Sequence, residues 1–328
     1  MGTSLATLAS RPGRRPAATL ALLLLLLAGC DAAAGTPVHP VEGLLILTKG
    51  DSARLDLLAA KRDPEKSVAI RLPLPANDIT SISAGDDGVL VASTADGDIA
   101  TSDPVDPRGS AADIAGLEWT PVEATDEDGA VLAGPARFAA WDPGGGRFAA
   151  LGGDLQGGAD LTLLLVDPGD GRLTTIDLKR PMLSGPPVWL DAGRLALLSS
   201  SPSDLAPIVV DTTSGKVTNG PAGDRRLATS ADGRVIATSA GEGAPVVLRS
   251  SKGWLADDGT SIGSVELPDG FTEAISLALD ATGDRLAIVW RAEDGTARAD
   301  VHDGTDGWRR VWSEPLAGTA AAAVAWLR

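Results

Sequence analysis

The architecture of this chain is indicated most directly by Ile275-Ser276-Leu277-Ala278-Leu279-Asp280-Ala281-Thr282-Gly283-Asp284-Arg285-Leu286-Ala287-Ile288-Val289. Two short runs of apolar and branched residues flank a turn that contains aspartate and glycine. Glycine accepts a positive φ without steric cost, and aspartate bonds to its own backbone in such turns. The stretch therefore predicts a β-hairpin.

Four other segments repeat this pattern, at residues 79–92, 138–151, 187–198 and 227–238. The last glycines of the five turns are separated by 40 to 58 residues, and they are Gly88, Gly146, Gly193, Gly233 and Gly283. Two further strands follow the hairpin, as at 161–167 and 172–178. Four short strands in a unit of this length are typical of β-propeller blades.

The two ends of the chain complement each other. Residues 43–48 have the pattern of a second strand without a first, and residues 321–327 have the pattern of a first strand with nothing after it. Trp326 aligns with Trp141 and Trp189 in other units. We therefore predict that the last strand completes the first blade, which removes exposed sheet edges.

The resulting expectation is an all-β, six-bladed β-propeller closed by N- and C-terminal strands that share one blade. The blades are expected at residues 43–75 plus 318–328, 76–125, 132–182, 183–221, 222–268 and 269–317. The alternative is seven blades, with an additional unit within residues 104–135. The hairpin signature resembles that of the WD-repeat-like and TolB-like propeller superfamily across residues 43–328, a resemblance that implies the fold but no particular function.

The first thirty residues have the features of an export signal. Arg11, Arg14 and Arg15 precede an apolar run at residues 18–28, which ends at Leu27-Ala28-Gly29-Cys30. These last four residues resemble the lipobox of bacterial lipoproteins. The resemblance implies cleavage before Cys30 and attachment of fatty acyl groups such as palmitate to its sulfur. The arginine pair leaves the export route open between the general secretory and twin-arginine pathways.

This reading divides the chain into a signal peptide at 1–29, a lipidated cysteine and tether at 30–42, and a propeller at 43–328. We expect a lipid-anchored protein on the extracytoplasmic face of the cell membrane, and a monomer. The chain carries 44 acidic and 28 basic residues, a formal net charge of −16, which argues against a nucleic-acid partner. Because Cys30 is the only cysteine, no intrachain disulfide can form.

Few residues carry the chemistry of a catalytic site. Of the two histidines, His39 lies in the tether and His302 lies beside Asp303 on a predicted strand. No Gly-x-Ser-x-Gly elbow accompanies His302, so we interpret it as a surface histidine near a turn. The sequence assigns no catalytic residue, no metal ligand and no cofactor. Calcium remains open, because acidic oxygen ligands are plentiful.

One set of acidic residues does follow from the blade map. The loop after the second strand of each blade contains at least one carboxylate, and all of these loops are expected at one mouth of the central channel. Such a rim of carboxylates favours a cation or a basic partner segment. Its members are Asp51, Asp96, Asp154, Asp160, Asp204, Glu242, Glu293 and Asp294.

The tryptophans are interpreted mainly as packing residues. Trp141, Trp189 and Trp326 recur at one strand position, which indicates packing between blades. Trp119 and Trp254 are expected on or near outer strands, where they can be exposed. Trp308 and Trp312 are four residues apart on one predicted strand and hence on one face, beside Arg309 and Arg310. They form either a docking edge or part of the packing between blades.

These observations favour a non-catalytic protein-interaction or ligand-binding module of the cell envelope, with an envelope protein as its partner. The alternative function is a calcium-dependent hydrolase or lactonase with its site at the channel mouth.

Overall fold

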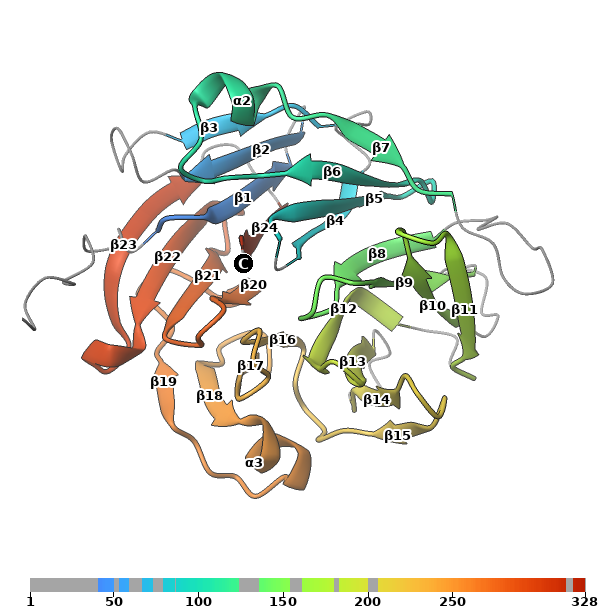
Figure 1. Ribbon diagram of the computed structural model, residues 1–328. Coiled ribbons are helices and arrows are strands. Elements are labelled where there is room, and N and C mark those ends of the chain that lie inside the picture. Colours follow the sequence, from blue (N-terminus) through green and yellow to red (C-terminus); the bar gives the residue numbers. More distant parts are fainter. Residues whose placement is uncertain are drawn as a thin grey trace, which may run out of the picture. The chain divides into compact units, whose positions relative to one another are not determined.

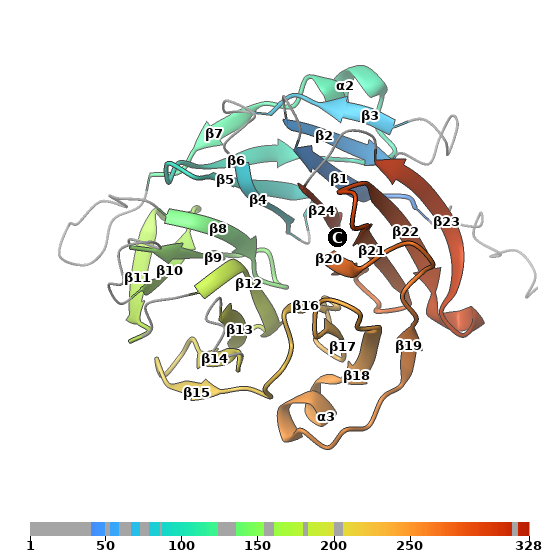
Figure 2. The same ribbon diagram turned by 180° about the vertical axis from the view of Figure 1, so that it is seen from behind.

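A computed structural model describes residues 41–49, 53–58, 67–72, 79–85, 87–123, 136–153, 161–179, 183–199, 206–316 and 321–327. All of these residues belong to one compact unit, residues 39–328. In that unit the described strands form six four-stranded sheets arranged in a ring, as two opposite views show (Figures 1 and 2). This confirms the predicted six-bladed β-propeller.

Each blade runs from an innermost strand at the channel to an outermost strand at the periphery, and its strands are named in that order. The first blade contains β24 (Ala321–Trp326), β1 (Leu44–Lys49), β2 (Ala53–Leu58) and β3 (Ser67–Ile70). The second contains β4 (Ile79–Ala84), β5 (Val89–Thr94), β6 (Ile99–Pro104) and β7 (Trp119–Pro121). The third contains β8 (Ala136–Trp141), β9 (Phe148–Gly152), β10 (Thr162–Asp167) and β11 (Arg172–Asp177).

The other three blades follow the same order. The fourth contains β12 (Leu183–Asp191), β13 (Arg194–Ser199), β14 (Ile208–Asp211) and β15 (Val217–Asn219). The fifth contains β16 (Arg226–Thr229), β17 (Val235–Ser239), β18 (Val246–Ser250) and β19 (Gly263–Val265). The sixth contains β20 (Glu273–Leu279), β21 (Arg285–Arg291), β22 (Ala297–Asp303) and β23 (Arg309–Leu316). Short helical segments occur at α2 (Ala111–Ala115), α3 (Ser251–Ala256) and η2 (Gly304–Asp306).

The last strand closes the ring as predicted. β24 pairs antiparallel with β1 in a continuous register that runs from Leu44 opposite Trp326 to Lys49 opposite Ala321. The first blade is therefore built from both ends of the propeller, and the inner edge of β1 is covered. The stretch from residue 104 to 123 supplies α2 and β7 of the second blade rather than a seventh sheet.

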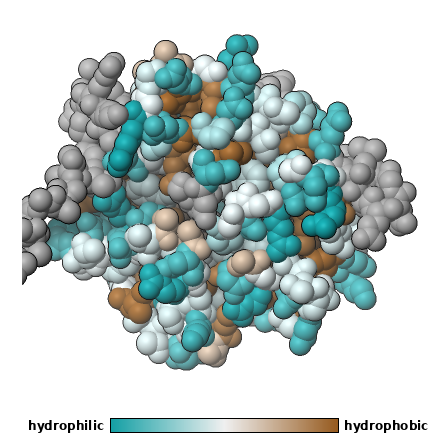
Figure 3. Space-filling model, in the orientation of Figure 1, coloured by the Kyte–Doolittle hydropathy of each residue, from teal (hydrophilic) through white to brown (hydrophobic). Residues whose placement is uncertain are grey.

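Neighbouring blades are held together by apolar side chains that alternate along each strand. On β22, Ala297, Ala299 and Val301 belong to a buried cluster shared with the first blade. On β21, Leu286 and Ile288 belong to a second cluster shared with the fifth blade. Because successive strand residues point to opposite faces, each sheet contributes to two such layers. The core therefore lies between the blades. On the face shown in Figure 3, hydrophobic residues are scattered among polar ones.

The turn glycines also take part in this packing. Gly233 has φ +66°, and a Cβ at this position would collide with the carbonyl oxygen of Leu190 in the preceding blade. Gly283 has φ +77° and lies against Val235 of the preceding blade. In the third blade the positive φ belongs to Gly145 rather than to Gly146, the glycine aligned from the sequence. These turns need glycine for close approach as well as for backbone conformation.

Two predictions for tryptophans were wrong. Trp254 is fully buried, because Ser250 caps a short helix, α3, that turns the indole into the core between the fourth and fifth blades. Trp308 and Trp312 do not share a face, although the interpretation that they pack between blades is confirmed. Trp308 precedes β23 in the left-handed region, at φ +63°, and packs toward the fifth blade, whereas Trp312 packs toward the first.

Candidate functional site

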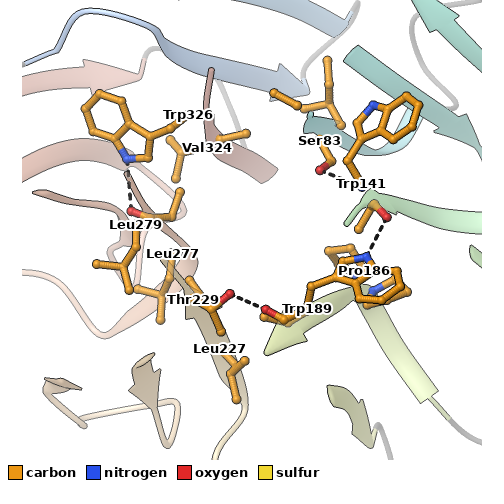
Figure 4. Close-up of a pocket in the computed structure, with 18 residues that line it drawn as sticks. Ser83, Trp141, Pro186, Trp189, Leu227, Thr229, Leu277, Leu279, Val324 and Trp326 are labelled. Carbon is orange, nitrogen blue, oxygen red and sulfur yellow. Dashed lines mark hydrogen bonds between the residues drawn. The ribbon is translucent and has the colours of Figure 1, made fainter. Parts of the chain in front are cut away.

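The central channel contains a cavity of about 130 Å³ that is lined by the innermost strands of all six blades (Figure 4). Most of the side chains that line it are apolar, among them Trp141, Trp189, Leu279 and Trp326. The lining residues lie in the last part of each first strand, so the cavity is nearer the end of the ring that carries the turns between first and second strands.

Polar groups of the wall are used to join neighbouring blades. The Trp189 indole donates from Nε1 to the carbonyl oxygen of Ala140 at 3.0 Å, and the Trp326 indole donates to Ala278 at 3.2 Å. The Thr229 hydroxyl donates to the carbonyl oxygen of Trp189. Ser83 accepts a hydrogen bond from the amide of Trp141 at 3.2 Å. Figure 4 shows these four bonds around the cavity, which confirms that the recurring tryptophans join blades.

Trp141 differs from the other two tryptophans in one respect. Its side chain is as buried as theirs, at 4 % exposed, but its Nε1 has no hydrogen-bond partner among the described residues. Its ring instead meets Phe148 edge-on, with 5.6 Å between centroids, and lies against Gly85.

The antiparallel strand order defines two faces of the ring. The first strand of a blade begins, and its second strand ends, at the same face, which we call the rim face. The loops between second and third strands lie on it. The tight turns between first and second strands lie on the opposite face, which we call the hairpin face.

Four of the predicted rim carboxylates lie in described loops of the rim face, and all are exposed. Asp96 lies in the loop between β5 and β6, and Glu242 lies in the loop between β17 and β18. Glu293 and Asp294 lie in the loop between β21 and β22. The topology therefore brings them to one face, while the wall of the channel cavity is formed by other residues. Asp51, Asp154, Asp160 and Asp204, together with Cys30, lie outside the described residues.

The four carboxylates are not equivalent. Asp294 accepts hydrogen bonds from the amide and hydroxyl of Thr296, at 2.9 and 2.7 Å, which lower its pKa and fix it in its own turn. Within the described part of the chain, no hydrogen bond or ion pair engages the side chains of Asp96, Glu242 or Glu293. Glu293 and Asp294 also line a shallow hollow beside Phe271. The guanidinium carbon of Arg298 stacks over the Phe271 ring, 4.4 Å from its centroid.

His302 was predicted to be a surface residue, and this was wrong. Its side chain is 6 % exposed, because the face of β22 that carries Arg298, Asp300 and His302 packs toward the fifth blade. Its Nδ1 lies 2.9 Å from the carbonyl oxygen of Trp308 and therefore donates to it. Burial lowers the pKa of His302 below its ordinary value. The carboxylate of Asp303 accepts from Thr305 in the neighbouring turn instead of facing the imidazole.

A buried ion pair on the same strand was not foreseen. Asp300 is fully buried and accepts hydrogen bonds from Arg298 Nη2 at 2.7 Å and from the Ser313 hydroxyl at 2.6 Å. Arg310 lies 3.7 Å away. The alternation of charged and small residues in β22 was visible in the sequence, but it resembles that of an exposed strand.

A second cavity, of about 330 Å³, opens on the rim face beside the channel, between the fourth, fifth and sixth blades. It shares Pro186, Val188, Leu227 and Leu277 with the channel wall, and its one charged lining residue is Arg226. Sequence reasoning missed Arg226. The available signal was an arginine pair, Arg225-Arg226, at the start of a first strand whose other residues are apolar or small.

The described ranges contain no cluster of three or more histidine, cysteine, aspartate or glutamate side chains placed to hold a metal ion. Among the helices in these ranges, none has the length and apolar character needed to cross a bilayer.

Comparison with solved structures identifies the fold. TolB from Acinetobacter baumannii superimposes with a TM-score of 0.60 and 15 % sequence identity, covering 88 % of this chain and 67 % of TolB. A chain of the nidogen–laminin complex gives 0.56 and 12 %, covering 86 % and 98 %. A protein assigned as TolB from Agrobacterium tumefaciens gives 0.53 and 13 %, covering 87 % and 98 %.

At these identities the likeness establishes the β-propeller fold and nothing about activity. No family model matches the sequence, and no curated protein sequence matches it. The propeller of this chain is therefore similar in fold to that of TolB.

Proposed function

We propose that this protein is a non-catalytic binding module of the cell envelope, held at the extracytoplasmic face of the membrane by a lipid on Cys30. Its propeller presents the rim-face loops to another envelope protein. The observation that carries the proposal is where the apolar and the charged side chains lie in the ring. The side chains of the channel wall are mainly apolar, with hydroxyls that join blades, whereas the rim face carries three exposed carboxylates that make no hydrogen bond or ion pair with the described residues, Asp96, Glu242 and Glu293.

The partner we propose is a basic segment of an envelope protein. Asp96, Glu242, Glu293 and Asp294 come from three blades and lie on one face of a chain with net charge −16. Like charges on one rigid face add their potentials, which attracts cations and accelerates encounter with a basic partner. A likeness in fold to TolB is compatible with this role but supplies no partner.

The proposed partner is tested by capture from envelopes with a charge-matched control. The test variant is Asp96→Asn/Glu242→Gln/Glu293→Gln/Asp294→Asn. The control is Asp87→Asn/Asp170→Asn/Asp284→Asn/Asp306→Asn, which removes the same number of negative charges from exposed positions in turns of the hairpin face.

We expect the wild-type protein and the control to retain one envelope protein that the rim variant loses, with retention falling as salt rises. Equal retention by all three proteins, or loss only in the control, would contradict the rim proposal. A calcium-dependent rise in melting temperature that disappears in Asp154→Ala/Glu242→Ala/Glu293→Ala would instead favour a metal site and the hydrolase alternative.

The anchor is tested separately. A palmitate analogue fed to cells should label the wild-type protein and not Cys30→Ser, and the mature protein should begin at Cys30. An unlabelled wild-type protein that retains residues 1–29 would overturn the anchor without bearing on the propeller.

A further inference from the structure

The rim-face cavity has the size and lining of a small-molecule site. Its volume of about 330 Å³ lies within the range of ligand pockets. Three blades contribute apolar side chains to it, among them Pro186 and Val188 of β12, Leu198 of β13 and Ile275 of β20. Such a wall favours the apolar body of a ligand, because burial of that body releases ordered water.

Arg226 supplies the one charge in this wall. Its Nη1 donates to the carbonyl oxygen of Arg225 at 2.8 Å. Its Nε is buried and has no hydrogen-bond partner within the described residues. Because protein atoms enclose the Nε, a ligand in the cavity would bond to the Nη groups, which carry four of the five guanidinium N–H donors.

The carboxylate nearest to Arg226 is paired with another arginine. Glu273 is the nearby carboxylate, and it is already paired with Arg291 Nη2. Arg225 and Arg291 add positive charge, and burial lowers the pKa of Arg226. An anion at this point would offset both the repulsion and the loss of hydration.

The chemistry of this wall suits an anion with a single charge. The Ser276 hydroxyl also lines the cavity, but its oxygen is turned toward the first blade, where it accepts a hydrogen bond from the amide of Val324 at 3.1 Å. One guanidinium in an otherwise apolar wall matches a single carboxylate, which arginine binds through two parallel N–H donors.

We propose that this cavity binds a small apolar carboxylate, with the carboxylate on Arg226 and its apolar body between the fourth, fifth and sixth blades. A monoanion fits better than a phosphate, because the surrounding rim face is acidic and repels higher negative charge. The ligand is either a free aliphatic acid or the C-terminal carboxylate of an apolar peptide. This inference goes beyond the acidic rim and does not depend on it.

The test measures binding by isothermal titration calorimetry with three probes. Octanoate represents the free aliphatic acid, N-acetyl-leucine represents a peptide C-terminus, and octanamide is the uncharged control. We expect octanoate or N-acetyl-leucine to bind at least tenfold more tightly than octanamide. The tighter of the two carboxylates identifies the source of the ligand. Absence of binding by both carboxylates, or equal binding of octanamide, would overturn the proposal.

Variants locate the site. Arg226→Gln should weaken carboxylate binding at least tenfold, and Arg226→Lys should weaken it less because the charge remains. Arg234→Gln, which removes an exposed arginine from a turn of the hairpin face, should bind like the wild type. Circular dichroism confirms that each variant is folded.

Unchanged affinity in a folded Arg226→Gln would overturn the assignment. The four-residue rim variant should retain carboxylate binding. The pocket and the rim can therefore fail independently.

Discussion

Two tryptophans at the same position of adjacent blades are expected to respond differently to the same substitution. Trp189 and Trp141 are 3 % and 4 % exposed, and both line the channel. The Trp189 indole donates to Ala140, whereas the Trp141 indole N–H is buried without a partner among the described residues. Phenylalanine removes the N–H and a similar volume at both positions.

The hydrogen bond lost in Trp189→Phe is worth about 1 kcal/mol of stability. Removal of the unpaired N–H in Trp141→Phe regains about 1–3 kcal/mol, which offsets part of the loss from reduced packing. We therefore expect Trp189→Phe to lower the free energy of unfolding by about 2–4 kcal/mol more than Trp141→Phe.

Urea unfolding followed by far-ultraviolet circular dichroism measures both values, since this signal does not depend on tryptophan fluorescence. Equal losses in the two variants, with unchanged m-values, would refute the assignment of these hydrogen bonds. A larger loss in Trp141→Phe would refute it more strongly.

Three further predictions concern stability. Burial lowers the pKa of His302 below its ordinary value of 6.5, so the unfolded chain takes up the proton first and the free energy of unfolding should fall as pH drops below 6.5. His302→Gln in a His39→Gln background should flatten this pH dependence in urea titrations between about pH 7 and pH 5. An unchanged dependence of the free energy of unfolding on pH would contradict this prediction. Asp300→Ala should cost about 3–5 kcal/mol, because it leaves the Arg298 guanidinium without its buried partner. Exposed Asp306→Ala should cost less than about 1 kcal/mol, and comparable losses in the two would count against the buried network. Gly233→Ala should destabilise more than Gly259→Ala: both glycines have positive φ, which costs about 1–2 kcal/mol for alanine, but only at Gly233 would the added Cβ strike a neighbouring blade. Equal melting temperatures for these two variants would argue against that contact.

The fold was predictable because its determinants are local and repeated. An aspartate- and glycine-containing turn between two apolar runs indicates each hairpin, and five such hairpins give the spacing of the blades. Closure was predictable because Trp326 matched Trp141 and Trp189 in sequence, and the three tryptophans occupy corresponding positions in the ring.

The environments of outer-strand residues were not predictable in the same way. Trp254 is buried because Ser250 caps a short helix that contains it. Trp308 itself has a positive φ, so it does not continue the alternation of β23. His302 is buried because the face of β22 that carries charged residues packs toward the next blade. In each case the outcome depends on a contact between blades, which alternation within one strand does not encode.

The candidate sites also include one part that the sequence predicts and one that it does not. The loops that carry Asp96, Glu242, Glu293 and Asp294 follow from strand order alone, and the structure places them on one face. The cavity at Arg226 requires three blades to meet at a particular angle and was not visible in the sequence.

Both proposed surfaces exist only if the ring is closed by the last strand, and a disulfide cross-link tests this most directly. Thr48 and Ala322 are opposite each other in the register of β1 and β24. Paired residues on antiparallel strands lie within the Cα separation that a disulfide bridges. In a Cys30→Ser background, Thr48→Cys/Ala322→Cys should form an intramolecular disulfide on mild oxidation, while Thr48→Cys/Ala325→Cys, shifted by three residues, should not. A cross-link only in the shifted pair, or in neither, would contradict the closed six-bladed ring.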